Sequence, residues 1–239
     1  MKPKLKILNL VAEYPAEARA ILELLGTVDY LPSLSPKELL EKIGGYDVVV
    51  MALGLNFHKE VLAKAKKLKF IVTATTGLDH LDLVEAEKRG IKVLSLKTET
   101  EFLKTITGTA ELAFNLLLDL SRFTPWAFES VKNYQWCKED FRGRNLCGKT
   151  LGIVGLGRLG KMMARFGKAF GMKVLFADPN VLPKDFPEYE EVSLEKLLRE
   201  SDAISLHVHL DKETENLLAK KEFAQMKKGA VLINTSRGK

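Results

Sequence analysis

The sequence predicts an α/β protein built on parallel sheets, and two patterns carry this prediction. Short apolar runs of strand length alternate with helix-length segments along the whole chain. A glycine-rich corner in residues 150–160, TLGIVGLGRLG, joins one of these runs to a helix. Because parallel strands need crossover connections, which are usually helices, we expect sheets covered on both faces by helices.

Length and composition narrow the function classes. The chain has 239 residues, enough for two modest domains, with 46% hydrophobic and 28% charged residues. The net charge is +6, but basic and acidic residues are interleaved and no aromatic ladder accompanies them, so no nucleic-acid partner is expected. The N-terminal segment lacks the apolar core of a secretion signal, and no apolar run of membrane-spanning length occurs. Cys137 and Cys147 form neither a metal motif nor a disulfide framework, so we expect a cytoplasmic protein without a metal site.

In the first hundred residues the pattern predicts four strands and four helices. Ser35, Pro36 and Glu38 have the N-cap, first-turn proline and acid of a helix start. Gly26 is expected to end the first helix, and residues 97–104 look polar and irregular. The expected strands are 5–11, 46–52, 70–74 and 91–96, and the expected helices are 15–25, 36–45, 58–68 and 82–89.

The second half begins with a helix at 109–120 that is apolar nearly all round, which predicts burial on several sides. We place the domain boundary just before it, so that residues 1–103 and 104–239 form the two domains. Residues 122–148 hold Trp126 and Trp136 and could contact a second subunit or lie on their own domain. The expected strands are 151–154, 173–177, 203–208 and 230–234, and the expected helices are 159–170, 193–200 and 214–226.

The glycine corner has the residues of a dinucleotide-binding site. Gly155 allows a tight turn, Gly157 lets backbone approach a pyrophosphate, and Gly160 lets the helix pack close to the strand. Asp178 follows the next strand eighteen residues later, where an acid binds the adenosine ribose. Its charge would repel a 2′-phosphate and no arginine follows at 179–181, so NAD is favoured over NADP. The alternative is a structural strand–helix corner with a turn aspartate.

Several residue sets together resemble one family, the NAD-dependent D-isomer-specific 2-hydroxyacid dehydrogenases. This group includes D-3-phosphoglycerate dehydrogenase, glyoxylate reductase and D-lactate dehydrogenase. The order and separation of the motifs match the family from about residue 45 to the last residue. The matching stretches are TGLDHLD at 76–82, TAE at 109–111, GKTLGIVGLGRLG at 148–160, FGMKV at 170–174, DAISLH at 202–207 and NTSRG at 234–238.

The resemblance implies a flavodoxin-like first domain that binds substrate and a Rossmann second domain that holds NAD. Backbone amides at Thr76 and Gly77 would take the substrate carboxylate, and Arg237 would be the catalytic arginine. A homodimer formed through the Rossmann domain is also implied. The implied cofactor contacts are Gly155, Gly157, Arg158, Leu159 and Gly160 along the pyrophosphate, Asp178 on the ribose, His207 and Val208 at the cofactor border, and Thr235, Ser236 and Arg237 on the nicotinamide side.

The chemistry of Arg237 agrees with that role. It follows a predicted parallel strand, so it would lie in the crevice at the carboxyl ends, where ligands bind α/β sheets. A guanidinium can bind a carboxylate through two donors and still polarise a neighbouring carbonyl.

One departure from the family concerns its general base, a histidine tuned by a glutamate, since both follow the arginine in the family and this chain ends two residues after it. The roles expected of His58, His80, His207 and His209 are packing, capping or cofactor contact. We therefore expect a fragment or truncation whose first domain lacks its return segment and whose Rossmann domain lacks its last strands. Residues 230–234 would then be the fourth strand, at an edge of the sheet.

Three functions follow in order of preference. The first is an NAD-dependent oxidoreductase that interconverts a D-2-hydroxy acid and a 2-keto acid, with the activity of these 239 residues alone in doubt. The second is an NAD-binding regulatory module without catalysis, resembling transcriptional corepressors. The third is another Rossmann enzyme that uses NADP or S-adenosyl chemistry, although Asp178 disfavours NADP on charge grounds.

Overall fold

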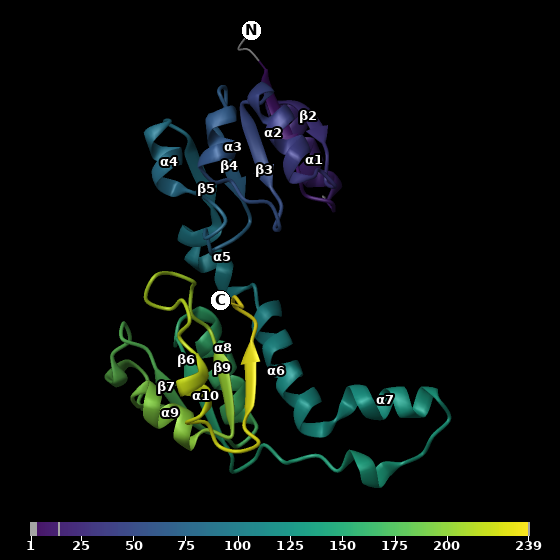
Figure 1. The fold of residues 1–239 in the computed structure, drawn as a ribbon, viewed down its shortest axis with the longest axis vertical. Helices are drawn as coiled ribbons and strands as arrows, with labels where there is room; N and C mark the ends of the chain where they lie inside the picture. Colours follow the sequence, from purple (N-terminus) through teal and green to yellow (C-terminus); the bar gives the residue numbers. More distant parts are fainter. Residues whose placement is uncertain (1–3, 14, 239) are drawn as a thin grey trace. The chain divides into compact units, whose positions relative to one another are not determined.

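The computed structural model describes residues 4–13 and 15–238, and the chain divides into two compact units, Met1–Leu103 and Lys104–Lys239 (Figure 1). Each unit holds a five-stranded sheet in which all strand pairs of the described residues are parallel. The predicted α/β class with parallel sheets is therefore confirmed. No helix among the described residues has the length and apolar character needed to cross a bilayer.

The first sheet has the strand order β2-β1-β3-β4-β5. Its central strand, Val48–Met51, is wholly apolar and buried, as expected when helices cover both faces. The strands are β1 (Leu5–Asn9), β2 (Gly26–Tyr30), β3 (Val48–Met51), β4 (Phe70–Thr73) and β5 (Lys92–Ser95), and the helices are α1 (Ala16–Leu25), α2 (Pro36–Lys42), α3 (Lys59–Lys64), α4 (Leu83–Lys88) and α5 (Thr100–Lys104).

Local contacts confirm some of the predicted element boundaries and correct others. The predicted start of α2 is confirmed, because Ser35 Oγ accepts the amide of Glu38 and Glu38 Oε2 accepts the amide of Ser35. Gly26 is the first residue of strand β2, which the sequence analysis missed. A Cβ at Gly26 would lie 1.9 Å from the Leu5 carbonyl oxygen, so only glycine allows this close strand pairing. The 97–104 segment is also more regular than expected, since it contains a 3-10 turn and α5.

The second sheet has the order β10-β9-β6-β7-β8. Counted along the chain this order is 3-2-1-4-5, so residues 230–234 hold the fifth strand rather than the predicted fourth. The short strand β8, which the sequence analysis missed, takes the third position. The strands are β6 (Thr150–Val154), β7 (Lys173–Ala177), β8 (Glu190–Glu191), β9 (Ala203–Leu206) and β10 (Val231–Asn234), and the helices are α8 (Arg158–Ala169), α9 (Leu194–Glu200) and α10 (Lys220–Phe223).

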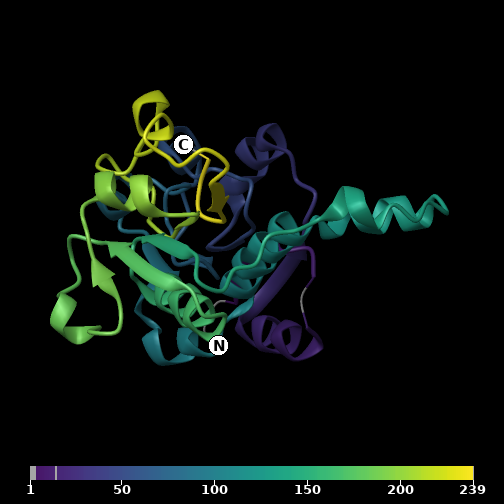
Figure 2. The same ribbon diagram turned by 90° about the horizontal axis from the view of Figure 1, so that it is seen from below.

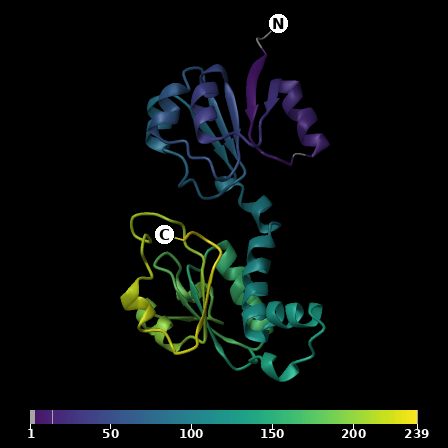
Figure 3. The same ribbon diagram turned by 45° about the vertical axis from the view of Figure 1, so that its right-hand side comes forward.

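Helix α6 (Gly108–Arg122) packs on the second unit beside α8 (Figure 3), with the Phe114 ring 5.6 Å from that of Phe166. The prediction that α6 is buried on several sides is wrong for this unit. One face is buried, whereas Leu112, Leu116 and Leu120 form an outer stripe that is 37–52% exposed. After a left-handed turn at Phe123, helix α7 (Thr124–Lys132) extends away from the second sheet (Figure 2).

The helix predicted over 214–226 is also wrong, because only Lys220–Phe223 is α-helical. Asp211 Oδ1 accepts the amides of Glu213 and Thr214, which satisfies these backbone groups in a turn. Asn216 then adopts a left-handed φ of 57°, which no helix accommodates.

Candidate active site at the carboxyl edge of the second sheet

The glycine corner lies where the second sheet reverses its strand order. Strand β6 is central, with β7 on one side and β9 on the other, and parallel sheets bind ligands in the crevice at this reversal. Gly155 has a φ of +88°, and a Cβ there would lie 2.8 Å from the His207 carbonyl oxygen. A Cβ at Gly160 would lie 2.1 Å from the Gly155 carbonyl oxygen. Gly157 faces open space, with no atom within 4 Å of its Cβ position.

Asp178 is tied directly to this corner. Its Oδ2 accepts the amide of Leu156 at 2.7 Å, and its Oδ1 accepts the amide of Asn180 at 2.8 Å. The carboxylate therefore lies beside the turn between Gly155 and Gly157, at the end of β7. Leu156 is a contact that the sequence analysis did not identify, because its amide meets Asp178 only once the two strands are paired.

Arg158 and Leu159 open helix α8, and both are half-buried. The guanidinium of Arg158 donates from Nη1 to the Ile106 carbonyl oxygen at 2.5 Å, which links the start of α8 to the segment before α6. The helix begins at the glycine corner, so its first amides and its positive dipole end face the same edge of the sheet as Asp178.

His207 and Val208 follow β9 at the same edge. The Val208 side chain touches the Gly155 position, and the His207 amide donates to the Val154 carbonyl oxygen. His207 Nε2 lies 2.9 Å from Ser205 Oγ. Burial lowers the pKa of His207 to about 4, so the imidazole is neutral at pH 7.

Thr235, Ser236 and Arg237 follow β10, beside His207. Ser236 Oγ donates to the Leu206 carbonyl oxygen at 3.0 Å. Asn234 shapes the turn, because its Oδ1 accepts the Ser236 amide and its Nδ2 donates to the Arg237 carbonyl oxygen at 2.7 Å. In the sequence, Asn234 stands out only as the first residue of the NTSRG motif. A polar amide followed by small residues after a buried strand is the signal of such a turn.

Arg237 is exposed and lines a small pocket of about 190 Å³. Val208, His209 and Ser236 line the same pocket, together with apolar side chains that include Leu206 and Leu232.

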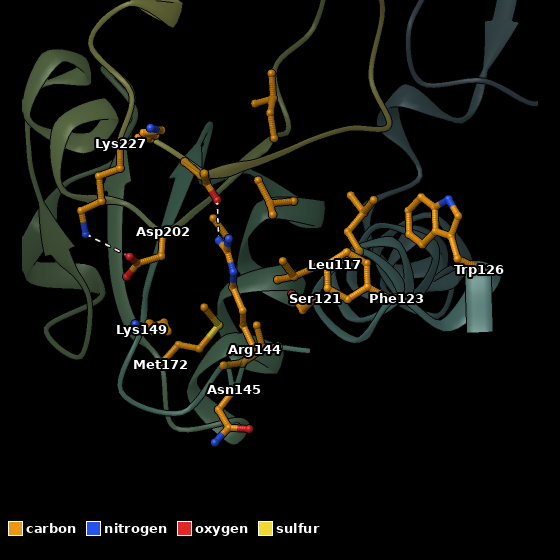
Figure 4. A pocket seen from close by; sticks show the side chains of 18 residues that line it. Leu117, Ser121, Phe123, Trp126, Arg144, Asn145, Lys149, Met172, Asp202 and Lys227 are labelled. Atoms are coloured by element: carbon orange, nitrogen blue, oxygen red, sulfur yellow. Dashed lines mark hydrogen bonds and ion pairs between the residues drawn. The ribbon is translucent and has the colours of Figure 1, made fainter. Parts of the chain in front are cut away.

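A second pocket, of about 470 Å³, lies at the amino ends of the strands (Figure 4). Asp202 there pairs with Lys227 at 3.2 Å, and Arg144 donates to the Gly229 carbonyl oxygen at 2.9 Å. The smaller pocket is the candidate site, because it shares its edge with the glycine corner.

The structure thus gathers the predicted cofactor residues and Arg237 at one edge of the second sheet. Thr76 and Gly77 belong to the first unit, where they follow β4. Of the other histidines, His58 is exposed at the start of α3 and His80 is buried in the first unit.

Sequence comparison supplies the family of this fold and site. Residues 114–239 match the description "D-isomer specific 2-hydroxyacid dehydrogenase, NAD binding domain", and residues 8–139 match "D-isomer specific 2-hydroxyacid dehydrogenase, catalytic domain". The chain belongs to this family. Its second unit is the Rossmann, NAD-binding domain of the family, so NAD is the cofactor of this fold.

Relatives and solved structures agree. The chain is 37% identical to D-3-phosphoglycerate dehydrogenase of Methanocaldococcus jannaschii over 93% of its length, and 44% identical to glyoxylate reductase of Thermococcus litoralis over 84%. It spans 42% and 62% of those two proteins. Its fold resembles D-lactate dehydrogenase of Aquifex aeolicus, solved with NAD and lactic acid, with a TM-score of 0.83 and 30% identity over 98% of this chain and 69% of that one. The TT0316 protein of Thermus thermophilus gives a TM-score of 0.85 with 34% identity over 98% of this chain and 74% of that one.

The residues present fit NAD. Gly157 leaves open space beside the start of α8, and Asp178 places a carboxylate next to it. Two buried polar atoms at the ends of β9 and β10, His207 Nδ1 and Thr235 Oγ1, have no partner among the described residues. Buried polar atoms are normally hydrogen-bonded, so a polar ligand at this edge is the simplest account of both.

Burial of His207 predicts an acid-sensitive stability. The imidazole has a pKa of about 4 in the fold and about 6.5 in the unfolded chain, so the unfolded chain binds more protons between these values. The contribution of the neutral imidazole to the free energy of unfolding is therefore complete above pH 6.5 and is lost as the pH falls toward 4. Between pH 7 and pH 5 the loss is about 2 kcal/mol. Urea unfolding at both pH values should show a smaller loss in His207→Gln than in the wild type.

The matched control for this experiment is His58→Gln, which changes an exposed imidazole and should keep the wild-type loss. Equal losses in His207→Gln and the wild type would contradict a neutral, buried His207.

Proposed function

We propose that this protein is an NAD-dependent oxidoreductase that interconverts a D-2-hydroxy acid and the corresponding 2-keto acid. The observation that carries the proposal is that Arg237 follows β10 at the same carboxyl edge of the sheet as the glycine corner, two strands away, in the NAD-binding domain of this family. The names of relatives support the substrate class, because they include glyoxylate reductase, hydroxypyruvate reductase and D-3-phosphoglycerate dehydrogenase.

In this proposal each group at the edge has a defined task. Bound NADH or NAD supplies or accepts the hydride. The amides at the start of α8 and the backbone at Gly157 bind the pyrophosphate, with Arg158 and Leu159 alongside. Asp178 accepts hydrogen bonds from the adenosine ribose hydroxyls. His207, Val208, Thr235 and Ser236 border the nicotinamide and its ribose.

Arg237 acts on the substrate. Two guanidinium donors bind the planar carboxylate, and the positive charge stabilises the oxygen that becomes alkoxide-like during hydride transfer. In the first unit, the backbone amides of Thr76 and Gly77 are the groups proposed to bind a substrate carboxylate. His207 acts here as a neutral hydrogen-bonding group, because an imidazole with a pKa of about 4 is not protonated to the cation at pH 7.

The test is a binding and turnover experiment on the complete protein. NADH binding is followed by fluorescence, and NADH oxidation is then measured with glyoxylate, hydroxypyruvate and pyruvate. Saturable NADH binding with turnover of at least one acid supports the proposal. NADH binding without any turnover favours the NAD-binding regulatory alternative, and absence of binding contradicts both.

Cofactor choice is tested by the same titration. Asp178→Ala should weaken NADH binding more than NADPH binding, because it removes both a ribose acceptor and the charge that repels a 2′-phosphate. Equal effects on the two cofactors would contradict this role for Asp178.

We also propose a homodimer formed through α6 and α7 of the second unit. Trp126 and Phe128 on α7 and Trp136 in the loop after it are 50–81% exposed, next to the α6 outer stripe. Large aromatic side chains of this kind are enriched at protein interfaces.

The two free, exposed cysteines support the cytoplasm as the compartment, because reducing conditions keep thiols unpaired.

The dimer predicts a specific loss of association. Phe128→Asp should convert the protein from twice the chain mass to the chain mass in light scattering, because it buries a charge at the interface. The control is Leu24→Asp, on a residue of α1 that is 84% exposed in the first unit, which should leave the mass unchanged. A wild type with the mass of one chain would contradict the dimer.

A further inference from the structure

The loop after β4 is held by two threonine hydroxyls. Thr75 Oγ1 lies 2.8 Å from the Gly77 carbonyl oxygen and 2.9 Å from Thr73 Oγ1. A carbonyl oxygen only accepts, so the single proton of Thr75 goes to Gly77. Thr73 must then donate its own proton to Thr75 Oγ1. The result is a directed relay from the buried end of the strand, through Thr75, to the loop.

This relay sets the orientation of one peptide group. In a trans peptide the carbonyl and the N–H point in opposite directions, and the described residues contain no cis bond. The Gly77 carbonyl oxygen is turned toward Thr75, so the N–H of Leu78 faces the other way. Among the hydrogen bonds of the described residues, none uses the N–H of Gly77 or of Leu78.

The far side of the loop is fixed independently. The Leu78 carbonyl oxygen accepts the Leu81 amide at 3.0 Å, and the Leu81 segment forms a parallel bridge with the fully buried Phe57. The loop is thus anchored on both sides, and the hydrogen bond from Thr75 to the Gly77 carbonyl oxygen opposes a flip of the peptide between residues 77 and 78. A flipped peptide would present a carbonyl oxygen, which repels a carboxylate.

We infer that Thr75, oriented by Thr73, is a positioning residue that keeps the Gly77–Leu78 peptide turned with its amide toward the substrate carboxylate. The inference rests on the proposed function, in which this loop binds that carboxylate, and adds Leu78 N–H as a donor. Thr75 itself touches no substrate. Its effect is on affinity for the acid, because a misoriented loop loses one charge-assisted hydrogen bond and gains a repulsive dipole.

The test uses amide NMR of the full chain titrated with glyoxylate, with Thr75→Val as the variant. Valine keeps the branched shape but cannot donate. In the wild type the Gly77 and Leu78 amide signals should shift on titration, and in Thr75→Val the apparent Kd should rise about tenfold, the scale of one hydrogen bond. Thr75→Ser should restore the wild-type Kd, and Thr27→Val, on an exposed threonine of β2, should leave it unchanged.

The outcomes separate the inference from the proposed function. Shifts with equal Kd in the wild type and Thr75→Val overturn the role of Thr75 and leave carboxylate binding at this loop intact. Absence of shifts in the wild-type loop overturns both the inference and the assigned carboxylate site, whereas NADH binding, measured separately, still tests the second unit. A raised Kd that Thr75→Ser fails to restore also overturns the inference, since the hydroxyl would then not be the cause.

Discussion

Replacing Gly160 by alanine is expected to reduce NADH affinity about a hundredfold and to destabilise the protein. The new Cβ would lie 2.1 Å from the Gly155 carbonyl oxygen and 3.1 Å from Ile153 Cγ2, in a fully buried position. Backbone at one of these contacts must move, because neither is the end of a flexible side chain. Overpacking of this kind costs about 1–3 kcal/mol, and a displacement of about 1 Å at a site can cost a hundredfold in function.

Two other glycines separate packing from ligand approach. Gly157→Ala places its methyl group in open space, so the urea midpoint should stay at the wild-type value while NADH affinity falls. Gly45→Ala also meets no atom within 4 Å, and it should change neither quantity. Fluorescence titration and urea unfolding measure both. A Gly160→Ala protein that binds NADH like the wild type would refute the proposed helix–strand contact.

Much of the architecture is predictable because local and long-range preferences agree. The apolar runs at 48–51, 70–73 and 151–154 are too short for buried helices, and each is followed by a helix that covers it, so parallel sheets follow. The α2 start is predictable for a similar reason, since Ser35 and Glu38 satisfy each other within three residues. Gly155 and Gly160 meet backbone at the contacts that the motif implies.

The errors occur where tertiary contacts decide. Gly26 ends a helix and begins a strand at once, and its role depends on the distant Leu5 carbonyl oxygen. Residues 214–226 have helical spacing, yet the Asp211 and Asn216 turns break it. In the sequence, the exposed leucines of the α6 outer stripe look like buried residues. Apolar periodicity does not say whether another element covers that face of the helix.

The candidate site shows the same division. Glycines and charged residues carry sequence signals, and all those predicted in the second unit lie at one edge of its sheet. Supporting contacts do not carry such signals. The Asn234 turn, the Leu156 amide on Asp178 and the Thr73–Thr75 relay depend on side-chain directions that only the folded backbone sets.

Replacing Arg237 by alanine is expected to lower kcat/KM for a 2-keto acid by about three orders of magnitude and to leave NADH affinity within about twofold. The reason is geometric. The turn at Asn234 holds the Arg237 backbone, so losing the side chain removes the guanidinium without altering the glycine corner. Arg237→Lys should recover only part of the loss, because an ammonium keeps the charge but cannot bind a carboxylate through two parallel donors.

The matched control lies at the other end of β10. Arg144, in the segment before β6, donates to the Gly229 carbonyl oxygen just before β10, so Arg144→Ala removes an arginine that contacts the amino end of this edge strand, away from the glycine corner. Its kcat/KM, corrected for any change in folded fraction, should equal that of the wild type. Equal losses in the two alanine variants would mean that Arg237 acts through stability. Full activity in Arg237→Ala would mean that another group binds and polarises the acid.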